Sequence, residues 1–247
     1  MIPKIIHYCW FGRGDKPKSV LNCIASWRTI CPDYTIKEWN EDNFDIRANQ
    51  YISEAYDSRK YAFVSDYARL YALFNEGGIY LDTDVEIKKT FDNFLHHSSF
   101  IGFESPIHIQ TGVMASVANV EWVSYLLEEY KNRVFITADG KLDTTTNVVK
   151  TTEYFIQQKL ITNGKHQSIA NCEIYPEDFF CAKDHRTGVI TQTKNTVCIH
   201  HYEGSWIKNS SISNLKHWLK LQFAQLFGGK ITTVISNIIT GRIFKSK

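Results

Sequence analysis

The sequence lacks three patterns that would assign it to a specialised class of protein. Its six cysteines form no Cys-x-x-Cys pair and show no regular spacing, so we expect reduced thiols, several of them buried, rather than a disulfide framework. No run of about eighteen apolar residues exists, which argues against a membrane-spanning helix. The first twelve residues have no long apolar core behind a charged start. We therefore expect no signal peptide and a cytoplasmic protein.

The chain also has a low net charge of only +2, which argues against a nucleic-acid partner. The charge is unevenly distributed. Residues 215–247 contain six Lys or Arg and no acidic residue, whereas the other 214 residues carry 22 basic and 26 acidic side chains, a net charge of −4. Apolar residues recur at helical spacing in this last part, so residues 211–247 are predicted to form a basic amphipathic helical tail. This tail could dock on the protein body, pair with a second copy, or lie on the anionic inner face of the cell membrane.

A chain of 247 residues is long enough for one well-buried α/β domain with a small appendage. Residues 4–11 read as a strand, 19–31 as a helix and 34–39 as a second strand. Such alternation predicts a mainly parallel central sheet flanked by helices. We place this domain at residues 1–210 and the tail at 211–247.

The most informative stretch runs from Ser65 to Glu86 and reads as a helix, a turn and a strand. Ser65 is a good N-cap, and Asp66 in the first turn suits the positive end of the helix dipole. Gly77-Gly78 ends the helix, and the apolar strand 79–81 follows. The stretch should therefore deliver whatever follows Leu81 to the carboxyl edge of the sheet, where open α/β folds bind ligands.

Two carboxylates, Asp82 and Asp84, stand at that edge. Held this close they repel each other, and a hard divalent ion such as Mn²⁺ or Mg²⁺ relieves the repulsion while leaving positions for substrate phosphates. Asp66 and Arg69 are three residues apart and share a helix face. Each feature alone has a simpler explanation: Asp-x-Asp is a common turn, Asp66 a helix-end charge, and Arg69 an exposed partner of Asp66. Their combination favours a metal site for a polyhydroxylated ligand carrying a diphosphate.

These residues carry a resemblance to a known family. Ser65-Asp66-x-x-Arg69 and Gly77-Gly78-x-Tyr80-x-Asp82-x-Asp84 resemble the core of the retaining glycosyltransferases with the DXD sugar-binding region, glycosyltransferase family 32. That family includes fungal mannosyltransferases and capsular-polysaccharide transferases, and it is distantly similar to the large glucosylating toxins. The resemblance covers about residues 1 to 210 and implies a GT-A type fold.

The resemblance also implies roles for individual residues. Asp82 and Asp84 would hold the metal and, with Asp66 and Arg69, form the catalytic set. Ser65, Asp66, Arg69, Tyr80 and Asp82 would contact the donor. Trp10 would stack on the nucleotide base beside Gly12, although core packing explains Trp10 equally well. His201, which fits the spacing to Gly204 better than His200, would be the third metal ligand, and Trp206 would cover the donor.

On the acceptor side the resemblance places Glu104 and Gln110-Thr111-Gly112, which otherwise read as ordinary strand-end residues. The implied reaction transfers a sugar from a nucleotide sugar, with a UDP-sugar favoured, to a glycan or lipid-linked glycan acceptor in capsular polysaccharide or lipopolysaccharide synthesis. Two alternatives stay open. A phosphatase of the haloacid dehalogenase type also uses Asp-x-Asp after a strand, but it normally has Thr or Val where Glu86 stands. A catalytically silent sugar-binding subunit would not need the complete set of Asp66, Arg69, Asp82 and Asp84.

Overall fold

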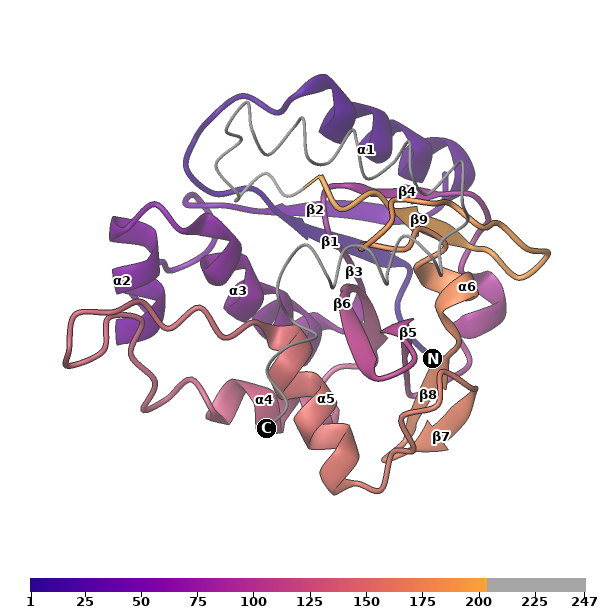
Figure 1. The fold of residues 1–247 in the computed structure, drawn as a ribbon. Helices are drawn as coiled ribbons and strands as arrows, with labels where there is room; N and C mark the ends of the chain where they lie inside the picture. Colours follow the sequence, from indigo (N-terminus) through magenta and orange to yellow (C-terminus); the bar gives the residue numbers. More distant parts are fainter. Residues whose placement is uncertain (204–247) are drawn as a thin grey trace.

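A mixed sheet runs through residues 1–203, the part of the chain that the computed structural model describes (Figure 1). Its seven strands lie in the order β2-β1-β3-β6-β5-β8-β7. They are β1 (Ile5–Cys9), β2 (Thr35–Trp39), β3 (Gly78–Leu81), β5 (Ser99–Ser105), β6 (His108–Ser116), β7 (Gln167–Ile169) and β8 (Cys172–Tyr175). A separate two-stranded sheet joins β4 (Val85–Ile87) to β9 (Cys198–His200).

The α/β class predicted from the sequence is confirmed, but the sheet is not mainly parallel. Strand β1 is parallel to β2 and β3, and β5 is parallel to β8, whereas β6 is antiparallel to both β3 and β5 and β7 is antiparallel to β8. The reason is local. Only two residues, Pro106 and Ile107, join β5 to β6, and a connection this short can form a hairpin but not a parallel crossover.

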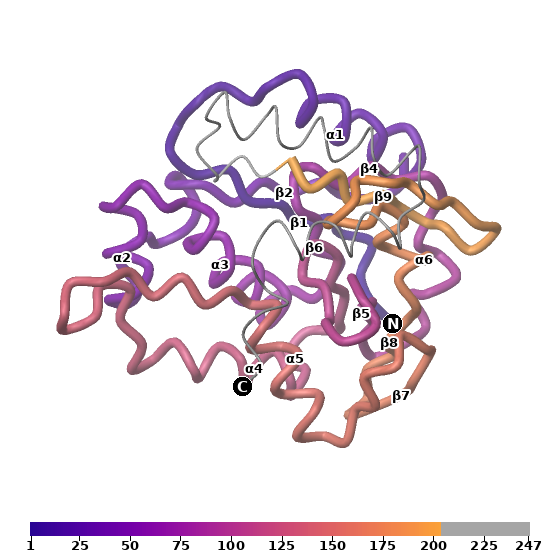
Figure 2. Tube along the Cα trace, in the orientation of Figure 1, coloured from indigo at the N-terminus to yellow at the C-terminus, as the bar shows by residue number. Residues whose placement is uncertain are grey.

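Helices cover the sheet on both faces (Figures 1 and 2). One face packs against α1 (Lys18–Ile30), the β4–β9 sheet and the short α6 (Glu177–Phe180). The other packs against α2 (Gln50–Asp57), α3 (Tyr61–Glu76), α4 (Glu121–Glu128) and α5 (Asn147–Gln157). A single 3-10 turn, Asp92–Phe94, precedes β5. Alternate residues of a strand face opposite layers, so in β3 Ile79 and Leu81 enter one core while Tyr80 enters the other.

The elements predicted over residues 4–11, 19–31, 34–39 and 79–81 occur at or near these positions as β1, α1, β2 and β3, with one correction in the central stretch. Ser65 is not an N-cap, because α3 begins at Tyr61 and Ser65 lies within it, its hydroxyl donating to the Tyr61 carbonyl at 3.1 Å. Phe63 and Val64 are buried and continue the apolar face of the helix toward its N-terminus. The turn that separates α2 from α3 contains Arg59, whose φ is 56°.

A buried histidine joins β1, β2 and the end of α3. Trp39 Nε1 can only donate, so Nδ1 of His7 accepts its hydrogen bond at 3.1 Å. Nε2 therefore carries the proton and donates to the Gly77 carbonyl at 2.8 Å. Burial lowers the pKa of His7, which keeps the ring neutral and in this tautomer. His7 is thus a structural residue that fixes where β3 begins.

All six cysteines are free and buried, as expected from their irregular spacing. Within residues 1–203 no helix is long and apolar enough to cross a membrane. The amphipathic tail predicted at 211–247, and with it the boundary at residue 210, lies outside the described residues.

Replacing Gly78 by alanine should lower the free energy of unfolding by about 2–4 kcal/mol, because this glycine has a φ of +102° and a Cβ there would lie 2.7 Å from the Ile5 carbonyl oxygen. Urea denaturation measures the loss. Gly14→Ala is the matched control, since no atom lies within 4 Å of its added Cβ, and it should stay within about 0.5 kcal/mol of wild type. Equal stability of the two variants would contradict this account of the strand's start.

Candidate functional site

The two-stranded sheet brings a distant histidine to the end of β3. Strand β9 pairs antiparallel with β4 so that His200 lies opposite Val85, the residue after Asp84. Nε2 of His200 is 3.1 Å from Oδ1 of Asp84 and 3.9 Å from Oδ2 of Asp82. One ligand atom from each of the three residues lies within 4.8 Å of the others, a group that could hold a metal ion.

Each carboxylate of this group uses one oxygen within the protein and turns the other toward the centre. Oδ1 of Asp82 accepts the Tyr80 hydroxyl at 2.9 Å, which leaves Oδ2 facing His200. Oδ2 of Asp84 accepts the Glu203 amide at 2.9 Å, which leaves Oδ1 facing His200. Such outer hydrogen bonds fix the direction of the ligand oxygens.

The histidine and the aspartates determine each other's charge. Burial disfavours a charged His200, but the charge of Asp84 and the hydrogen bond to it outweigh burial and raise the pKa of the imidazole. Burial likewise opposes ionisation of Asp84, yet the charge of His200 lowers the pKa of that carboxyl. These shifts favour an ion pair between His200 and Asp84.

The prediction of His201 as the third ligand is not what the structure shows, since His200 is the histidine beside the aspartates. Successive residues of an extended strand point to opposite sides, and His200 is the last residue of β9. The next residue, His201, turns away and places Nε2 3.1 Å from Oε2 of Glu86. Tyr202 then stacks on the His200 ring with 4.0 Å between centroids.

Arg69 is buried beneath this group, and oxygens of the protein surround its guanidinium. Nε donates to the Ser65 carbonyl, and Nη1 donates to the carbonyl and hydroxyl of Thr111. Nη2 lies 3.1 Å from Oδ1 of both Asp66 and Asp82. Three hydrogen bonds and two ion pairs thus surround the guanidinium. Burial alone would lower the pKa of Arg69, but Asp82, Tyr80 and Asp66 raise it, so the charge is permanent.

Asp66 also belongs to an internal network. Its carboxylate contacts Arg69 and accepts the backbone N–H of Asn147, the first residue of α5, at 3.3 Å. The Asn147 side chain donates to the Asp66 carbonyl and accepts the Tyr130 hydroxyl. Burial raises the pKa of Asp66 and outweighs the charge of Arg69. No pattern in the sequence indicated this link between Asn147 and Asp66.

Gly112 allows the close approach of β6 to the metal-binding group. A Cβ at this position would lie 2.7 Å from the His200 ring and 3.0 Å from Oδ2 of Asp82. Any larger residue would displace one of the two. The neighbouring Gln110 and Thr111 are occupied, because Gln110 bonds both backbone groups of Val113 and Thr111 holds Arg69.

Among the residues expected on the acceptor side, Glu104 of β5 differs from Gln110 and Thr111 in its lack of bonds to the described part of the chain. Within residues 1–203 its carboxyl group forms no hydrogen bond or ion pair, although it lies near enough to His200 to feel its charge. Burial raises the pKa of Glu104 to about 7. A carboxyl group that is mostly removed from water without a compensating donor is costly, and such groups concentrate at functional sites.

Trp10 and Gly12 do not bond to the metal-binding group. Trp10 is half-buried and its Nε1 donates to the Gly14 carbonyl at 2.6 Å, while the Gly12 amide donates to Glu41. Lys16 lies 5.7 Å above the Trp10 ring and also lines an open groove of about 460 Å³ between α1 and the first two strands. Trp206 lies outside the described residues, so base stacking by Trp10 and a cover by Trp206 stay predictions.

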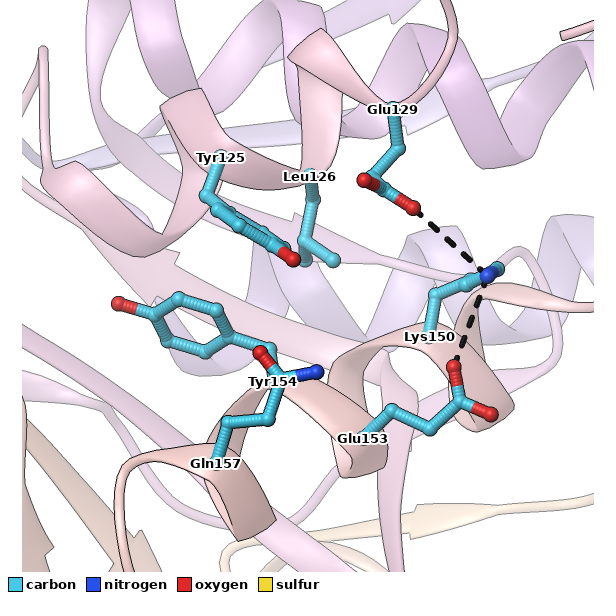
Figure 3. Close-up of a pocket in the computed structure, with 7 residues that line it drawn as sticks. All are labelled: Tyr125, Leu126, Glu129, Lys150, Glu153, Tyr154 and Gln157. Carbon is cyan, nitrogen blue, oxygen red and sulfur yellow. Dashed lines mark ion pairs between the residues drawn. The ribbon is translucent and has the colours of Figure 1, made fainter.

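A smaller pocket between α4 and α5 is not a good alternative site (Figure 3). Its volume is about 100 Å³, below the roughly 300–1,000 Å³ of typical ligand pockets. Its cation, Lys150, lies 3.7 Å from Glu129 and 3.5 Å from Glu153, so two carboxylates already neutralise it. Tyr125 and Tyr154 contact each other there at 4.9 Å between ring centroids.

Comparison with known proteins supports the resemblance seen in the sequence. Residues 17–101, about a third of the chain, match the family described as "Glycosyltransferase sugar-binding region containing DXD motif". This stretch contains Ser65, Asp66, Arg69, Asp82 and Asp84, so the resemblance to that family is confirmed over the residues that carry it. The match ends before β9, and it therefore does not include His200.

Curated relatives match part of the chain. Inositol phosphoceramide mannosyltransferase 3 of Schizosaccharomyces pombe is 33% identical over 117 residues, which are 46% of this chain and 33% of the relative. A mannosyl phosphorylinositol ceramide synthase of Saccharomyces cerevisiae is 28% identical over 143 residues, 55% of this chain and 38% of the relative. The chain thus spans about a third of the length of the curated relatives it matches.

Similar solved structures are more distant. The PaToxG glycosyltransferase is 17% identical, with a TM-score of 0.43 over 64% of this chain and 74% of that chain. The galactosyltransferase LgtC, solved with donor and acceptor sugar analogues, is 13% identical, with a TM-score of 0.42 over 88% of this chain and 94% of that chain.

Burial of the Glu104 carboxyl group predicts that the stability of the protein depends on pH in a defined way. Its folded pKa of about 7 lies above the ordinary 4.5, so the folded chain holds this proton more tightly and loses stability as pH rises between these values. Glu104→Gln should therefore be more stable than wild type at pH 8 by on the order of 2 kcal/mol, reduced for partial solvation, and equal to it near pH 4.

Thermal or urea unfolding at the two pH values measures this difference. Glu121→Gln, on the exposed first turn of α4, is the matched control and should change stability by less than about 0.5 kcal/mol at both. A Glu104→Gln gain that is the same at pH 4 and pH 8 would mean that burial of the charge is not its cause.

Proposed function

We propose that this chain is the catalytic region of a metal-dependent glycosyltransferase with a GT-A type fold. It would move a hexose or similar sugar from a nucleoside diphosphate sugar to a hydroxyl group of a polyhydroxylated acceptor, with retention of anomeric configuration. The observation that carries the proposal is the convergence of Asp82, Asp84 and His200 at a strand end, within a region that matches the DXD sugar-binding family.

The ligand set fits a divalent ion. Three ligand atoms within 4.8 Å of one another can close around an ion with bonds of about 2.1 Å after small side-chain movements. Two carboxylates suit Mg²⁺ and Mn²⁺ alike, and the imidazole favours Mn²⁺ because Mg²⁺ prefers oxygen ligands. A bound ion would neutralise negative charge on the diphosphate as the sugar leaves it.

The protein's own residues orient this site. Asp82 and Asp84 would hold the ion through Oδ2 and Oδ1, the oxygens that face His200. Arg69 and Tyr80 fix Asp82, and the Glu203 amide fixes Asp84. Because Arg69 is buried and pairs with Asp82 and Asp66, we assign Arg69 to positioning Asp82 rather than to binding sugar hydroxyls, and Asp66 to holding Arg69 in place.

The acceptor is proposed from two sources. The matched relatives carry names of enzymes that mannosylate inositol phosphoceramide, so a mannosyl donor and an inositol or sugar hydroxyl deserve testing beside the UDP-sugar and surface glycan inferred from the sequence. Both acceptors present the same chemistry, a ring of neighbouring hydroxyl groups. Glu104 has no hydrogen-bond partner within residues 1–203 and lies near His200, so its carboxyl group is suited to accept a hydrogen bond from such a ring.

The phosphatase alternative is less well supported by the site. A phosphatase of that type would use the first aspartate as a nucleophile. Here Oδ1 of Asp82 accepts Tyr80 and pairs with Arg69, while Oδ2 faces His200. Both oxygens are thus directed at fixed partners, as expected of a metal ligand held in place.

The first test is the melting temperature of the protein with Mn²⁺ and each of UDP, GDP, CMP and ADP. We expect one nucleoside diphosphate to raise it in a Mn²⁺-dependent manner, by about 2.7 kcal/mol of added stability at a ligand concentration 100 times Kd. Asp84→Asn should abolish the shift, because it removes a metal ligand and nearly preserves shape. No shift with any nucleotide, together with Mg²⁺-dependent hydrolysis of a phosphomonoester, would support the phosphatase instead.

The two adjacent histidines provide an internal comparison for metal binding. His200→Ala should weaken Mn²⁺ binding by about 10- to 100-fold, whereas His201→Ala should retain it, because only His200 lies beside both aspartates. Calorimetric titration of Mn²⁺ into each variant measures the affinities. If only His201→Ala lost Mn²⁺ binding, the third ligand would be His201, as its spacing to Gly204 predicted.

A further inference from the structure

A lysine outside every predicted motif lies beside the metal-binding group. Lys183 follows α6, and its ammonium group donates to the His201 carbonyl at 2.5 Å. The amide of the same residue, His201, donates to the Asp84 carbonyl at 2.9 Å. One residue of backbone therefore connects the Lys183 ammonium group to the second aspartate of the site.

The surroundings of this lysine are unusual for a structural residue. Its side chain is partly buried, and burial lowers the pKa of Lys183, opposed by the charges of Asp84 and Glu203. Within residues 1–203 no carboxylate pairs with its ammonium group, whose one bond goes to a neutral carbonyl. Partly buried charges are normally paired, because desolvation is costly. Two of its three donors are thus left for a ligand.

Other cations near the site are already committed. Arg69 is buried and pairs with Asp66 and Asp82, and His200 faces the two aspartates as a candidate ligand. Lys88 pairs with Glu86. Of the basic residues that the structure places around Asp84, Lys183 is the one whose charge the protein does not neutralise by contact.

We propose that Lys183 binds the diphosphate of the nucleotide donor and stabilises the negative charge that develops on it as the sugar departs. This inference rests on the proposed function and adds to it a residue that contacts the leaving group. The ion held by Asp82 and Asp84 would neutralise the diphosphate from one side, and the ammonium group would donate to a phosphate oxygen from the His201 side.

The position is also held firmly enough for this role. Tyr202, with a φ of 52°, turns the chain after His201, and its hydroxyl donates to the Cys181 sulfur at 3.4 Å. The segment that carries Lys183 is therefore tied to the segment that carries His200. A rigid support of this kind limits the entropy lost when a flexible lysine side chain binds its ligand.

The test compares Lys183→Met with Lys89→Met by calorimetric titration. Lys89 is a matched control, because its ammonium group also donates to a backbone carbonyl, that of Lys194, but at an exposed position. The probes are Mn²⁺ alone, and UDP, GDP and inorganic pyrophosphate in the presence of Mn²⁺. Lys183→Met should weaken binding of the preferred nucleoside diphosphate and of pyrophosphate by about 10- to 100-fold.

Mn²⁺ alone should bind Lys183→Met as well as or better than wild type, because a neighbouring positive charge is removed. Lys89→Met should match wild type with every probe. Lys183→Arg keeps the charge and should recover most of the lost affinity, so it carries the test should the methionine variant fold poorly.

Two results would overturn the assignment of Lys183. One is unchanged diphosphate affinity in Lys183→Met. The other is an equal loss for Mn²⁺ alone, which would mean that the lysine only supports the His201 turn. Failure of wild type itself to bind any nucleoside diphosphate with Mn²⁺ would instead refute the proposed function, and the role of Lys183 with it.

Discussion

The buried guanidinium of Arg69 is the constraint that organises the site. A permanent charge at 5% exposure must be compensated, and the protein does so with Asp66 and Asp82 and with three oxygens of Ser65 and Thr111. These partners come from α3, β6 and the end of β3, so one side chain fixes the helix, the strand and the first aspartate relative to one another. Removing either carboxylate would leave part of a buried charge unpaired, which is typically far more costly than losing a surface ion pair.

A second constraint comes from the short β4–β9 ladder, which joins residues more than a hundred positions apart. Three residue pairs and the bonds of His201 and Glu203 to Asp84 hold residues 198–203 against the Asp-x-Asp segment. Trp27 of α1 supports the ladder from behind, because it is fully buried and its Nε1 donates to the Val85 carbonyl at 2.7 Å. The candidate third ligand, His200, is therefore brought to the aspartates by tertiary structure and not by the motif itself.

The sequence predicted what depends on local pattern. The helix that becomes α3, the strand β3 and the edge position of Asp82 and Asp84 follow from apolar periodicity and from Gly77-Gly78. The error at Ser65 arose because a good capping residue can also lie inside a helix, bonded to the carbonyl four residues before it. The structure places His200 rather than His201 beside the aspartates because strand register, which decides the direction of each side chain, depends on pairing with β4. Lys183 belongs to no motif, so only its surroundings in the folded chain distinguish it.

Charge balance explains why such a site can be stable before it binds a ligand. Two aspartates, brought close by a strand end, would repel each other, and the structure relieves this by protonating His200 between them and by placing Arg69 behind Asp82. A divalent ion bound here would need a neutral imidazole, so its binding would release a proton, and the charge of the ion would replace that of the imidazolium. The three side chains already lie close together in this structure, with one ligand atom of each within 4.8 Å of the others. Folding thus brings these side chains together before any ligand binds, as in a preorganised site.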